Sequence, residues 1–262
     1  MTDLELILDA AREAGELAIT LRARGLQIEY KPGDASPVTN ADHATDALLT
    51  RRLREARPDY GWLSEETADN TARLHQRTIF VVDPIDGTRA FLKDRPWWTV
   101  CIAVVQDTRP IAAVVFAPDV AEIYAAQAGA GATLNGVPIA AGHRDTLENC
   151  TMVGDEALFR HPAWPTPWPP MQIASRNSTA YRMCLVAGGA ADAAVAVNPK
   201  QDWDLAAADL IALEAGAHCS DCQGLPFSYN RANPEQAGLV CASPGLAPLI
   251  LDRTRPIHVR HR

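Results

Sequence analysis

Hydrophobic residues at helical spacing open the chain. They recur every three or four positions, at Leu4, Ile7, Leu8, Ala11, Ala14, Leu17, Ala18 and Leu21. This period predicts an amphipathic helix that ends at Gly25. Thr39 and Asp42 then stand three residues apart, which predicts a capping box at the start of a second helix running towards Pro58.

The pattern changes to short apolar runs before residue 80. Ile79 to Val82 is a largely β-branched run, which predicts a buried strand ending at Asp83. Further apolar runs predict strands over 99–105, 111–116 and 122–126, and Asn135-Gly136 predicts a hairpin. We therefore expect residues 1–145 to form two helices packed on an antiparallel sheet.

Residues 146–262 mix helical and strand patterns. Helices are predicted over 178–187 and 204–215, strands over 193–197 and 238–242, and an irregular loop over the Pro/Trp segment 162–170. We interpret the chain as α/β. It has an N-terminal α+β subdomain (1–145) and a C-terminal α/β subdomain (146–262), with the active site expected in the cleft between them.

Composition and charge narrow the range of functions. The net charge of -8 argues against non-specific binding of a nucleic-acid polymer, because such binding needs a basic surface. The six cysteines lie mostly in apolar runs, where a free thiol behaves as a small hydrophobic group. The N-terminus is acidic rather than signal-like, and no apolar run reaches the roughly 18–20 residues of a transmembrane helix. We expect a cytoplasmic protein.

The main candidate for chemistry is the turn from Asp83 to Thr88. Two carboxylates, Asp83 and Asp86, follow a buried strand, and Pro84 stiffens the chain between them. With the Ile85 carbonyl they supply oxygen ligands of the kind that Mg²⁺ binds. Taken alone, the turn is more typical of a polar loop in which aspartates bond backbone amides.

Two further acidic clusters stand beside apolar elements. Glu65 and Glu66 follow the second helix, and Asp204 opens a later helix, where it also suits the N-cap position. Asp209 and Glu214 are expected on the solvated face of that helix. Together the three clusters predict a site in which two Mg²⁺ ions, about 3.5–4 Å apart, hold the attacking and leaving oxygens of a phosphate ester.

These motifs resemble the signatures of the inositol monophosphatase superfamily. The matching segments are Trp62–Glu66, Asp83–Phe91 and Trp203–Ala207; they stand in the family's order, and the resemblance spans about residues 5 to 250. The Gly-rich stretch 129–136 matches the family's hairpin, and we interpret it as structural. The resemblance implies a layered αβαβα sandwich and a Mg²⁺-dependent phosphomonoesterase, with the lithium sensitivity typical of the family.

The resemblance also implies roles for individual residues. The ligands of two or three Mg²⁺ ions would be Glu65, Asp83, the Ile85 carbonyl, Asp86 and Asp204. The catalytic residues would be Thr88, which orients the attacking water, its acidic partner Asp42, and Glu65. Backbone amides of Gly87 and Thr88 would bind the phosphate. The implied reaction is direct attack by a metal-activated water without a phosphoenzyme.

The substrate is less closely defined. Ser64 and Ala90 stand where the inositol branch usually has glycine and asparagine, so the chain is closer to the 3'(2'),5'-bisphosphate nucleotidases. The predicted substrate-binding residues are Asp86, Gly87, Thr88, Arg176, Asn177, Ser178, Lys200 and Asp204. Arg176 and Lys200 are candidates for a second phosphate. The alternatives are an inositol-1-monophosphatase and another small sugar or polyol phosphatase, such as a histidinol-phosphatase.

Other classes fit less well. A haloacid-dehalogenase phosphatase places its second aspartate two positions after the first, whereas here the spacing is three. A serine hydrolase is disfavoured by the lack of a Gly-x-Ser-x-Gly motif, and Cys219 and Cys222 form a single unpartnered C-x-x-C. A non-catalytic metal-binding interaction module stays open as a remote alternative. The expected partner is a small phosphorylated substrate, and a homodimer is compatible with the family.

Overall fold

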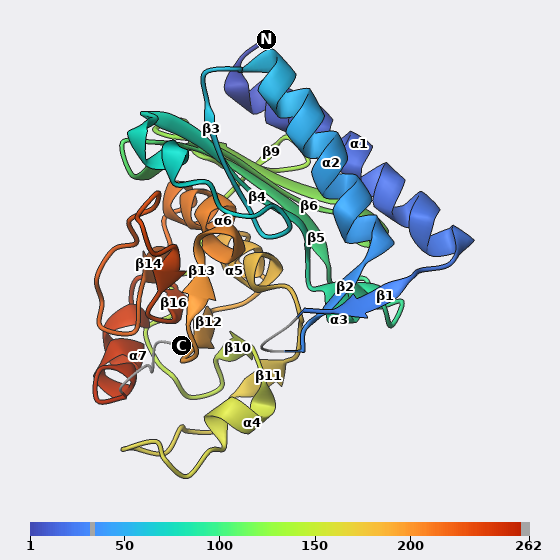
Figure 1. Cartoon of the computed structure of the whole chain (residues 1–262). Helices are drawn as coiled ribbons and strands as arrows, with labels where there is room; N and C mark the ends of the chain where they lie inside the picture. The colour runs from blue at the N-terminus through green and yellow to red at the C-terminus, as the bar shows by residue number, and fades with distance from the viewer. Residues whose placement is uncertain (32–34, 258–262) are drawn as a thin grey trace.

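Two long helices form the outermost layer of the molecule. The computed structural model describes residues 1–31 and 35–257, and in it α1 (Asp3–Arg24) and α2 (Asn40–Ala56) lie side by side on one face of a large sheet (Figure 1). Both begin with capping boxes, made by Thr2 with Glu5 and by Thr39 with Asp42. The predicted helix end at Gly25 and the predicted capping box at Thr39 are thereby confirmed.

The large sheet has seven strands in the order β3-β4-β5-β6-β7-β8-β9. They are β3 (Gly61–Ser64), β4 (Thr78–Asp86), β5 (Thr99–Gln106), β6 (Arg109–Ala117), β7 (Glu122–Gln127), β8 (Ala132–Leu134) and β9 (Val137–Ile139). All neighbours are antiparallel except β3 and β4, which are parallel. The expectation of a purely antiparallel sheet is wrong at this edge. The crossover through η1 (Thr71–His75) returns the chain to the same end of the sheet.

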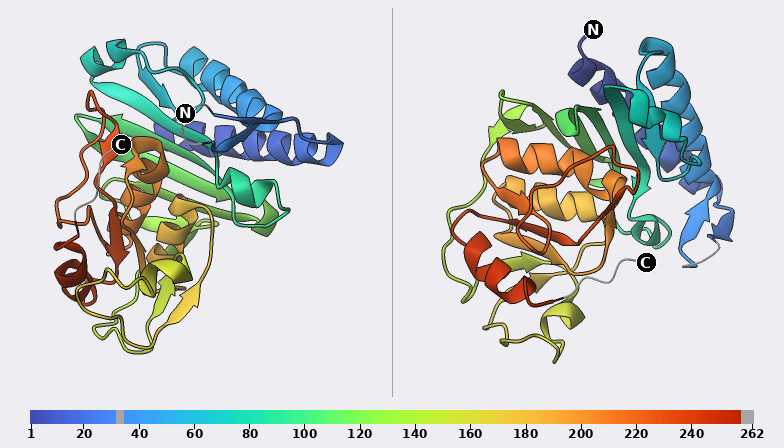
Figure 2. Two further views of the ribbon diagram at one scale, coloured as in Figure 1. Left: turned by 60° about the horizontal axis from the view of Figure 1, so that its bottom comes forward. Right: turned by 60° about the vertical axis from the view of Figure 1, so that its left-hand side comes forward.

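The second sheet has five strands in the order β11-β10-β12-β16-β14. They are β11 (Gln172–Ala174), β10 (Thr151–Val153), β12 (Ala193–Ala196), β16 (Leu239–Ala242) and β14 (His218–Ser220). Helices α5 (Thr179–Ala187) and α6 (Asp202–Glu214) lie between the two sheets, and α7 (Ala247–Thr254) covers the outer side of the second (Figures 1 and 2). The result is an αβαβα sandwich, as predicted.

Short elements complete the chain and border the site. They are β1 (Ile28–Tyr30), β2 (Pro37–Thr39), α3 (Thr88–Phe91), η2 (Pro118–Val120), α4 (Glu156–Phe159), β13 (Lys200–Gln201) and β15 (Glu235–Gln236). The strands β1 and β2 pair with each other, as do β13 and β15. The Pro/Trp segment 162–170 follows α4 without helix or strand, as its composition predicts.

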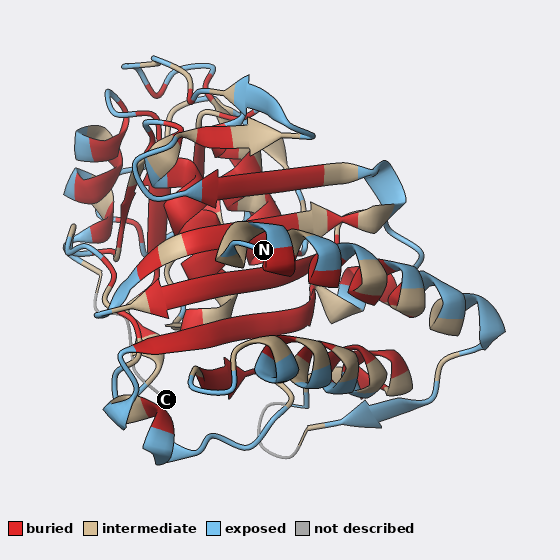
Figure 3. Cartoon of the chain, turned by 90° about the horizontal axis from the view of Figure 1, so that it is seen from above, coloured by how far each residue is buried: buried red, intermediate tan, exposed pale blue. Residues whose placement is uncertain are grey.

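Apolar packing holds the layers together on both faces of the large sheet. Its strands are buried along most of their length (Figure 3). One core joins them to α1 and α2, and another joins their opposite face to α5 and α6. Helix α6 is buried on nearly every side, because it lies between two sheets rather than on a surface.

The start and the burial of α6 correct two expectations about its acidic residues. Asp209 is only 1% exposed and accepts a hydrogen bond from Tyr229 Oη at 3.0 Å, so it does not lie on a solvated face. Asp204 is not the N-cap. The helix begins two residues earlier, Gln201 is its N-cap, and Asp204 Oδ2 accepts a hydrogen bond from the Gln201 amide at 2.9 Å. Helical periodicity cannot distinguish a solvated face from one that a second sheet covers.

Glu214, at the end of α6, also has a structural partner. Its two carboxylate oxygens accept hydrogen bonds from Gly129 N at 2.7 Å and from Gly131 N at 2.8 Å. The Gly-rich amides that would suit a phosphate therefore hold an internal carboxylate. This supports the structural interpretation of the 129–136 stretch.

The cysteines form no disulfide in the described residues. All six are free and buried, and Cys222 Sγ donates to the Ala196 carbonyl at 3.4 Å. Burial raises the thiol pKa of Cys222 to about 12, which is typical of a packed, unreactive thiol. In the part of the chain that the structure describes, no helix combines the length and the apolar character needed to cross a bilayer.

Candidate active site

The Asp83–Thr88 turn is held in one conformation by its own residues. The pairing of β4 with β5 is interrupted between Asp83 and Asp86, so the chain leaves the ladder there. Gly87 has φ +92°, a conformation that favours glycine. A Cβ atom at this position would lie 3.0 Å from the Trp97 carbonyl oxygen and 3.1 Å from the Ser178 amide nitrogen. The turn therefore needs glycine at position 87.

Asp83 is a buried carboxylate among other acidic groups. It is 1% exposed, and its Oδ1 accepts a hydrogen bond from the Ile85 amide at 3.0 Å. Burial raises its pKa well above the ordinary value, and the negative charges of Glu65, Asp86 and Asp204 raise it further. A buried anion in this setting calls for a cation.

Asp86 is fixed by the start of α5. Its Oδ2 accepts hydrogen bonds from Ser178 Oγ at 2.6 Å and from the Ala180 amide at 2.8 Å. Burial raises the pKa of Asp86 to about 6, and Asp204 acts in the same direction, whereas these hydrogen bonds and the nearby Lys200 oppose the rise. Ser178, predicted to bind substrate, thus orients a predicted metal ligand.

Three carboxylates from two distant segments converge. Asp83 and Asp86 end β4, Asp204 stands in the first turn of α6, and a carboxylate oxygen from each lies within 4.8 Å of the others. Their oxygens are the hard ligands that Mg²⁺ prefers, and their mutual repulsion is relieved when a divalent cation binds between them. The donor set fits Mg²⁺.

Glu65 and Glu66 lie beside this group, on a bend after β3. The Glu65 amide donates to the Val82 carbonyl, which keeps the bend next to the end of β4. Lys31 Nζ lies 2.8 Å from a carboxylate oxygen of each glutamate. Burial raises the pKa of Glu65 to about 7, and Lys31 opposes this rise. Both glutamates thus direct a carboxylate oxygen at the same cation, the Lys31 ammonium group.

Thr88 and Asp42 meet across the site, as the resemblance implies. Thr88 Oγ1 lies 3.3 Å from Asp42 Oδ1 and 3.2 Å from the Ile85 carbonyl oxygen, so its single proton has two acceptors. The other oxygen of Asp42 accepts from the Thr39 amide and hydroxyl at 2.8 and 2.6 Å. Asp42 thus caps α2 and contacts Thr88 at the same time.

The predicted substrate residues take different positions. Arg176 places its guanidinium over the Trp97 ring, 4.4 Å from the centroid, and donates to the neighbouring Ser175 carbonyl. Asn177 is exposed. Lys200, on β13, is half-buried and close enough to Asp86 to lower its pKa. Of the two cations predicted for a second phosphate, Lys200 therefore lies close to the carboxylate group, whereas the guanidinium of Arg176 stacks on Trp97.

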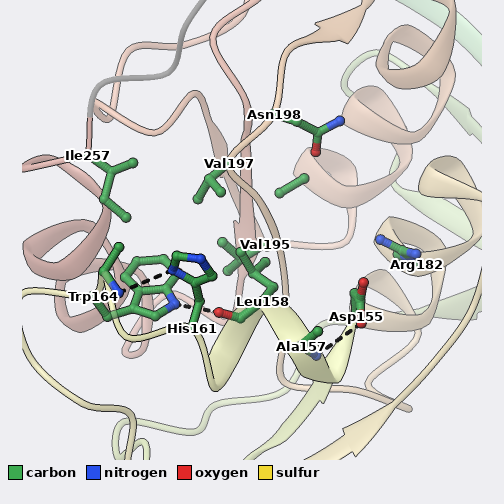
Figure 4. A pocket seen from close by; sticks show the side chains of 12 residues that line it. Asp155, Ala157, Leu158, His161, Trp164, Arg182, Val195, Val197, Asn198 and Ile257 are labelled. Carbon is green, nitrogen blue, oxygen red and sulfur yellow. Dashed lines mark hydrogen bonds between the residues drawn. The ribbon is translucent and has the colours of Figure 1, made fainter. Parts of the chain in front are cut away.

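A cavity of about 540 Å³, which no sequence pattern predicted, opens beside α5. Figure 4 shows His161 and Trp164 at one end and Asp155 with Arg182 at the other, with Val195 between them. The Trp164 indole is held by a hydrogen bond to the Leu158 carbonyl at 2.6 Å. The volume is in the range of small-molecule sites, about 300–1,000 Å³.

Arg182 connects this cavity to the carboxylate group. It lies one helical turn after Ser178, and both Asp86 and Asp155 act on its pKa, against the lowering caused by burial. Its Nε and Nη2 donate to the Arg176 carbonyl, and within residues 1–31 and 35–257 it makes no ion pair. The only feature of the sequence that could have pointed to Arg182 is its position four residues after Ser178. The cavity itself is made by segments that are far apart in sequence.

Comparison with known proteins gives consistent results. A model of the Inositol monophosphatase family matches residues 2–257. The 3'(2'),5'-bisphosphate nucleotidase CysQ of Salmonella typhimurium is 32% identical over 237 residues, covering 86% of this chain and 93% of that protein. The histidinol-phosphatase of Mycobacterium tuberculosis is 33% identical over 251 residues, covering 91% and 94%. The solved structure of an IMPase from Thermotoga maritima superposes with TM-score 0.83 at 24% identity, covering 98% of each chain.

Proposed function

The chain belongs to the inositol monophosphatase family and is a phosphoric monoester hydrolase, and from this premise we propose that it is a 3'(2'),5'-bisphosphate nucleotidase. The reaction is hydrolysis of 3'-phosphoadenosine 5'-phosphate to AMP. The observation that supports this substrate is Arg182, which lines the cavity beside α5 and also interacts electrostatically with Asp86. A bisphosphate brings a second anion for that cation, and its base suits the apolar and aromatic wall.

The family depends on Mg²⁺, and we carry over to this chain the ligands that the resemblance implies. We assign Glu65, Asp83 and the Ile85 carbonyl to one ion, and Asp83, Asp86 and Asp204 to a second. The convergence of the three aspartates supports the second set, and the cation-binding arrangement of Glu65 supports the first. When bound, Mg²⁺ lowers the pKa of a water molecule and neutralises negative charge on the phosphate.

The protein's own groups orient the reactants. With Asp42 accepting the Thr88 hydroxyl proton, a lone pair of Thr88 Oγ1 is left to accept a hydrogen bond from the attacking water. The phosphate is placed against the Gly87–Thr88 backbone, where the absence of a side chain at Gly87 allows close approach. Ser178 and Ala180 keep Asp86 in a single orientation while the ester is cleaved.

A second candidate is a histidinol-phosphatase. It is supported by Asp155, whose carboxylate lies at the same end of the cavity as Arg182 and suits the ammonium group of an amino alcohol (Figure 4). The similarity to the Mycobacterium tuberculosis histidinol-phosphatase points the same way. The two candidates differ in which charged residue of the cavity binds the leaving group.

A phosphate-release assay with Mg²⁺ separates these candidates. The substrates are 3'-phosphoadenosine 5'-phosphate, histidinol phosphate, inositol 1-phosphate and fructose 1,6-bisphosphate, each compared by kcat/KM. We expect the nucleotide to be preferred by about tenfold or more, because one charged hydrogen bond contributes about 1.5–3 kcal/mol. Preference for any other substrate overturns the nucleotidase proposal. Removal of metal with EDTA should abolish turnover, and added Mg²⁺ should restore it.

A further inference from the structure

A buried carboxylate outside the assigned ligand set accepts hydrogen bonds from both ends of the Glu65–Glu66 bend. Asp46 is 7% exposed, and its Oδ1 accepts a hydrogen bond from Ser64 Oγ at 2.5 Å. Its Oδ2 accepts from Thr67 Oγ1 at 2.7 Å. Ser64 directly precedes the glutamate pair and Thr67 directly follows it, so one side chain closes the bend from both sides.

The charge of Asp46 has no cationic partner in the described part of the chain. The hydrogen bonds of its carboxylate are donated by neutral hydroxyls. Burying an unpaired carboxylate is costly, and hydroxyl donors compensate the lost hydration only in part. Two apolar contacts would fix the bend at lower cost, but they would not set the direction of two hydroxyls.

The bend needs such a clamp because it carries like charges. Glu65 and Glu66 each place a carboxylate oxygen 2.8 Å from the same Lys31 Nζ, so their like charges lie close together and repel each other. Residues 65–67 belong to neither a helix nor a strand, and the backbone hydrogen bond from the Glu65 amide to the Val82 carbonyl fixes only the start of this segment. The amide of Glu66 donates to Ser64 Oγ at 3.4 Å, which links the clamp to the glutamates themselves.

The same face of α2 contacts the other acidic motif. Asp42 and Asp46 stand four residues apart on this helix, so their side chains lie one above the other. Asp42 contacts Thr88 at the end of the Asp83 turn, whereas Asp46 contacts the residues that flank Glu65. One rigid element therefore sets the relative position of two motifs that are about 20 residues apart in sequence.

We propose that Asp46 is a positioning residue that orients Glu65 for the first Mg²⁺ ion by clamping Ser64 and Thr67. The inference rests on the proposed role of Glu65 as a metal ligand. Groups that orient metal ligands change metal affinity by about 10–100-fold when they are removed. The effect of losing Asp46 should therefore appear as weaker Mg²⁺ binding rather than as a slower reaction at saturating Mg²⁺.

The test uses the full-length, metal-stripped protein. Isothermal titration with Mg²⁺, in the absence of substrate, is compared for the native protein, Asp46→Ala and Glu55→Ala. Glu55 is an exposed acidic residue two turns later on α2, so Glu55→Ala is the matched control. We expect Asp46→Ala to weaken Mg²⁺ binding by about 10–100-fold and Glu55→Ala to leave it unchanged. The Mg²⁺ concentration for half-maximal phosphate release should rise by the same factor, with kcat recovered at high Mg²⁺.

A purely structural role gives a different result. Partial unfolding would lower kcat at every Mg²⁺ concentration without moving the half-maximal concentration, and that outcome overturns the proposal. If Asp46→Ala does not fold, the double variant Ser64→Ala/Thr67→Val removes the same two hydrogen bonds and should show the same shift in Mg²⁺ affinity. The variant Glu65→Gln distinguishes failure of the metal assignment from failure of the positioning role. If it leaves Mg²⁺ affinity unchanged, the metal assignment is wrong; if only Glu65→Gln weakens binding, the positioning role alone is wrong.

Discussion

The two sides of the candidate site are built differently. On the phosphate side, Asp42, Asp83 and Asp86 are buried and each is fixed by hydrogen bonds from neighbouring backbone or hydroxyl groups. On the proposed leaving-group side, Asp155 and His161 are exposed, and part of the cavity wall comes from the segment after α4, which has neither helix nor strand. The phosphate side therefore sets one chemistry, whereas the leaving-group side can change its substrate at little cost to the fold.

The largest effect is expected on the phosphate side, from Asp86→Asn. The substitution removes a negative charge from the carboxylate group but keeps an oxygen that can accept from Ser178 and Ala180. We expect kcat to fall by about 10³-fold for every substrate, comparable to the loss of a major electrostatic contact in an active site. Circular dichroism should show an unchanged fold. Near-native turnover with Mg²⁺ would contradict the assignment of Asp86.

Thr88→Val tests the orientation of the attacking water. Valine keeps the shape of threonine but removes the hydroxyl that lies between Asp42 and the Ile85 carbonyl. We expect a fall in kcat of about 10²-fold, at the lower end of the range for a positioned proton-transfer group. Thr88→Ser is the matched control and should retain most of the activity. Equal losses in the two variants would show that the methyl group, not the hydroxyl, is needed.

Arg182→Gln moves the test to the leaving-group side. The change removes the positive charge at the inner end of the cavity. We expect KM for 3'-phosphoadenosine 5'-phosphate to rise about tenfold or more, because a charged hydrogen bond is lost. The kcat/KM for p-nitrophenyl phosphate, which has no second phosphate, should stay nearly constant. The exposed Arg51 on α2 provides the control, as Arg51→Gln. A uniform loss on both substrates would break the distinction between the two sides.

The smallest effect is expected from His161→Ala. His161 is exposed at the aromatic end of the cavity, and its Nδ1 accepts a hydrogen bond from the Ala163 amide at 3.1 Å. Loss of one aromatic contact is worth about 0.5–1.5 kcal/mol, so KM for the nucleotide should rise about two- to tenfold. His143→Ala, a change at an exposed histidine that does not line the cavity, should have no effect. An unchanged KM in both variants would place the base elsewhere.

Much of the fold follows from local patterns. The first two helices, the strand β4 and the Asn135-Gly136 hairpin were all predicted, because periodicity, caps and turn residues act over a few positions. The strand was predicted to end at Asp83, and it continues to Asp86. The parallel pairing of β3 and the burial of Asp209 were not predicted. Both depend on which element packs alongside, and a local pattern does not carry that information.

The candidate site divides along the same line. Glu65, Asp83, Asp86 and Asp204 could be selected from sequence because each acidic motif is short and follows an apolar element. Arg182 was missed because a lone arginine in a helix has no local signature. Asp46 was missed because its partners, Ser64 and Thr67, are 18 and 21 positions away.

The amino-acid sequence alone indicated the reaction class, the acidic motifs and the layered architecture of this protein. Those features depend on residue types at fixed short spacings, where covalent geometry limits the outcome. The packing in three dimensions set the rest: which carboxylates meet, that Arg176 lies over Trp97, and that Arg182 lines a cavity beside α5. These depend on the packing of α5 and α6 between two sheets, which brings together side chains that are far apart along the chain.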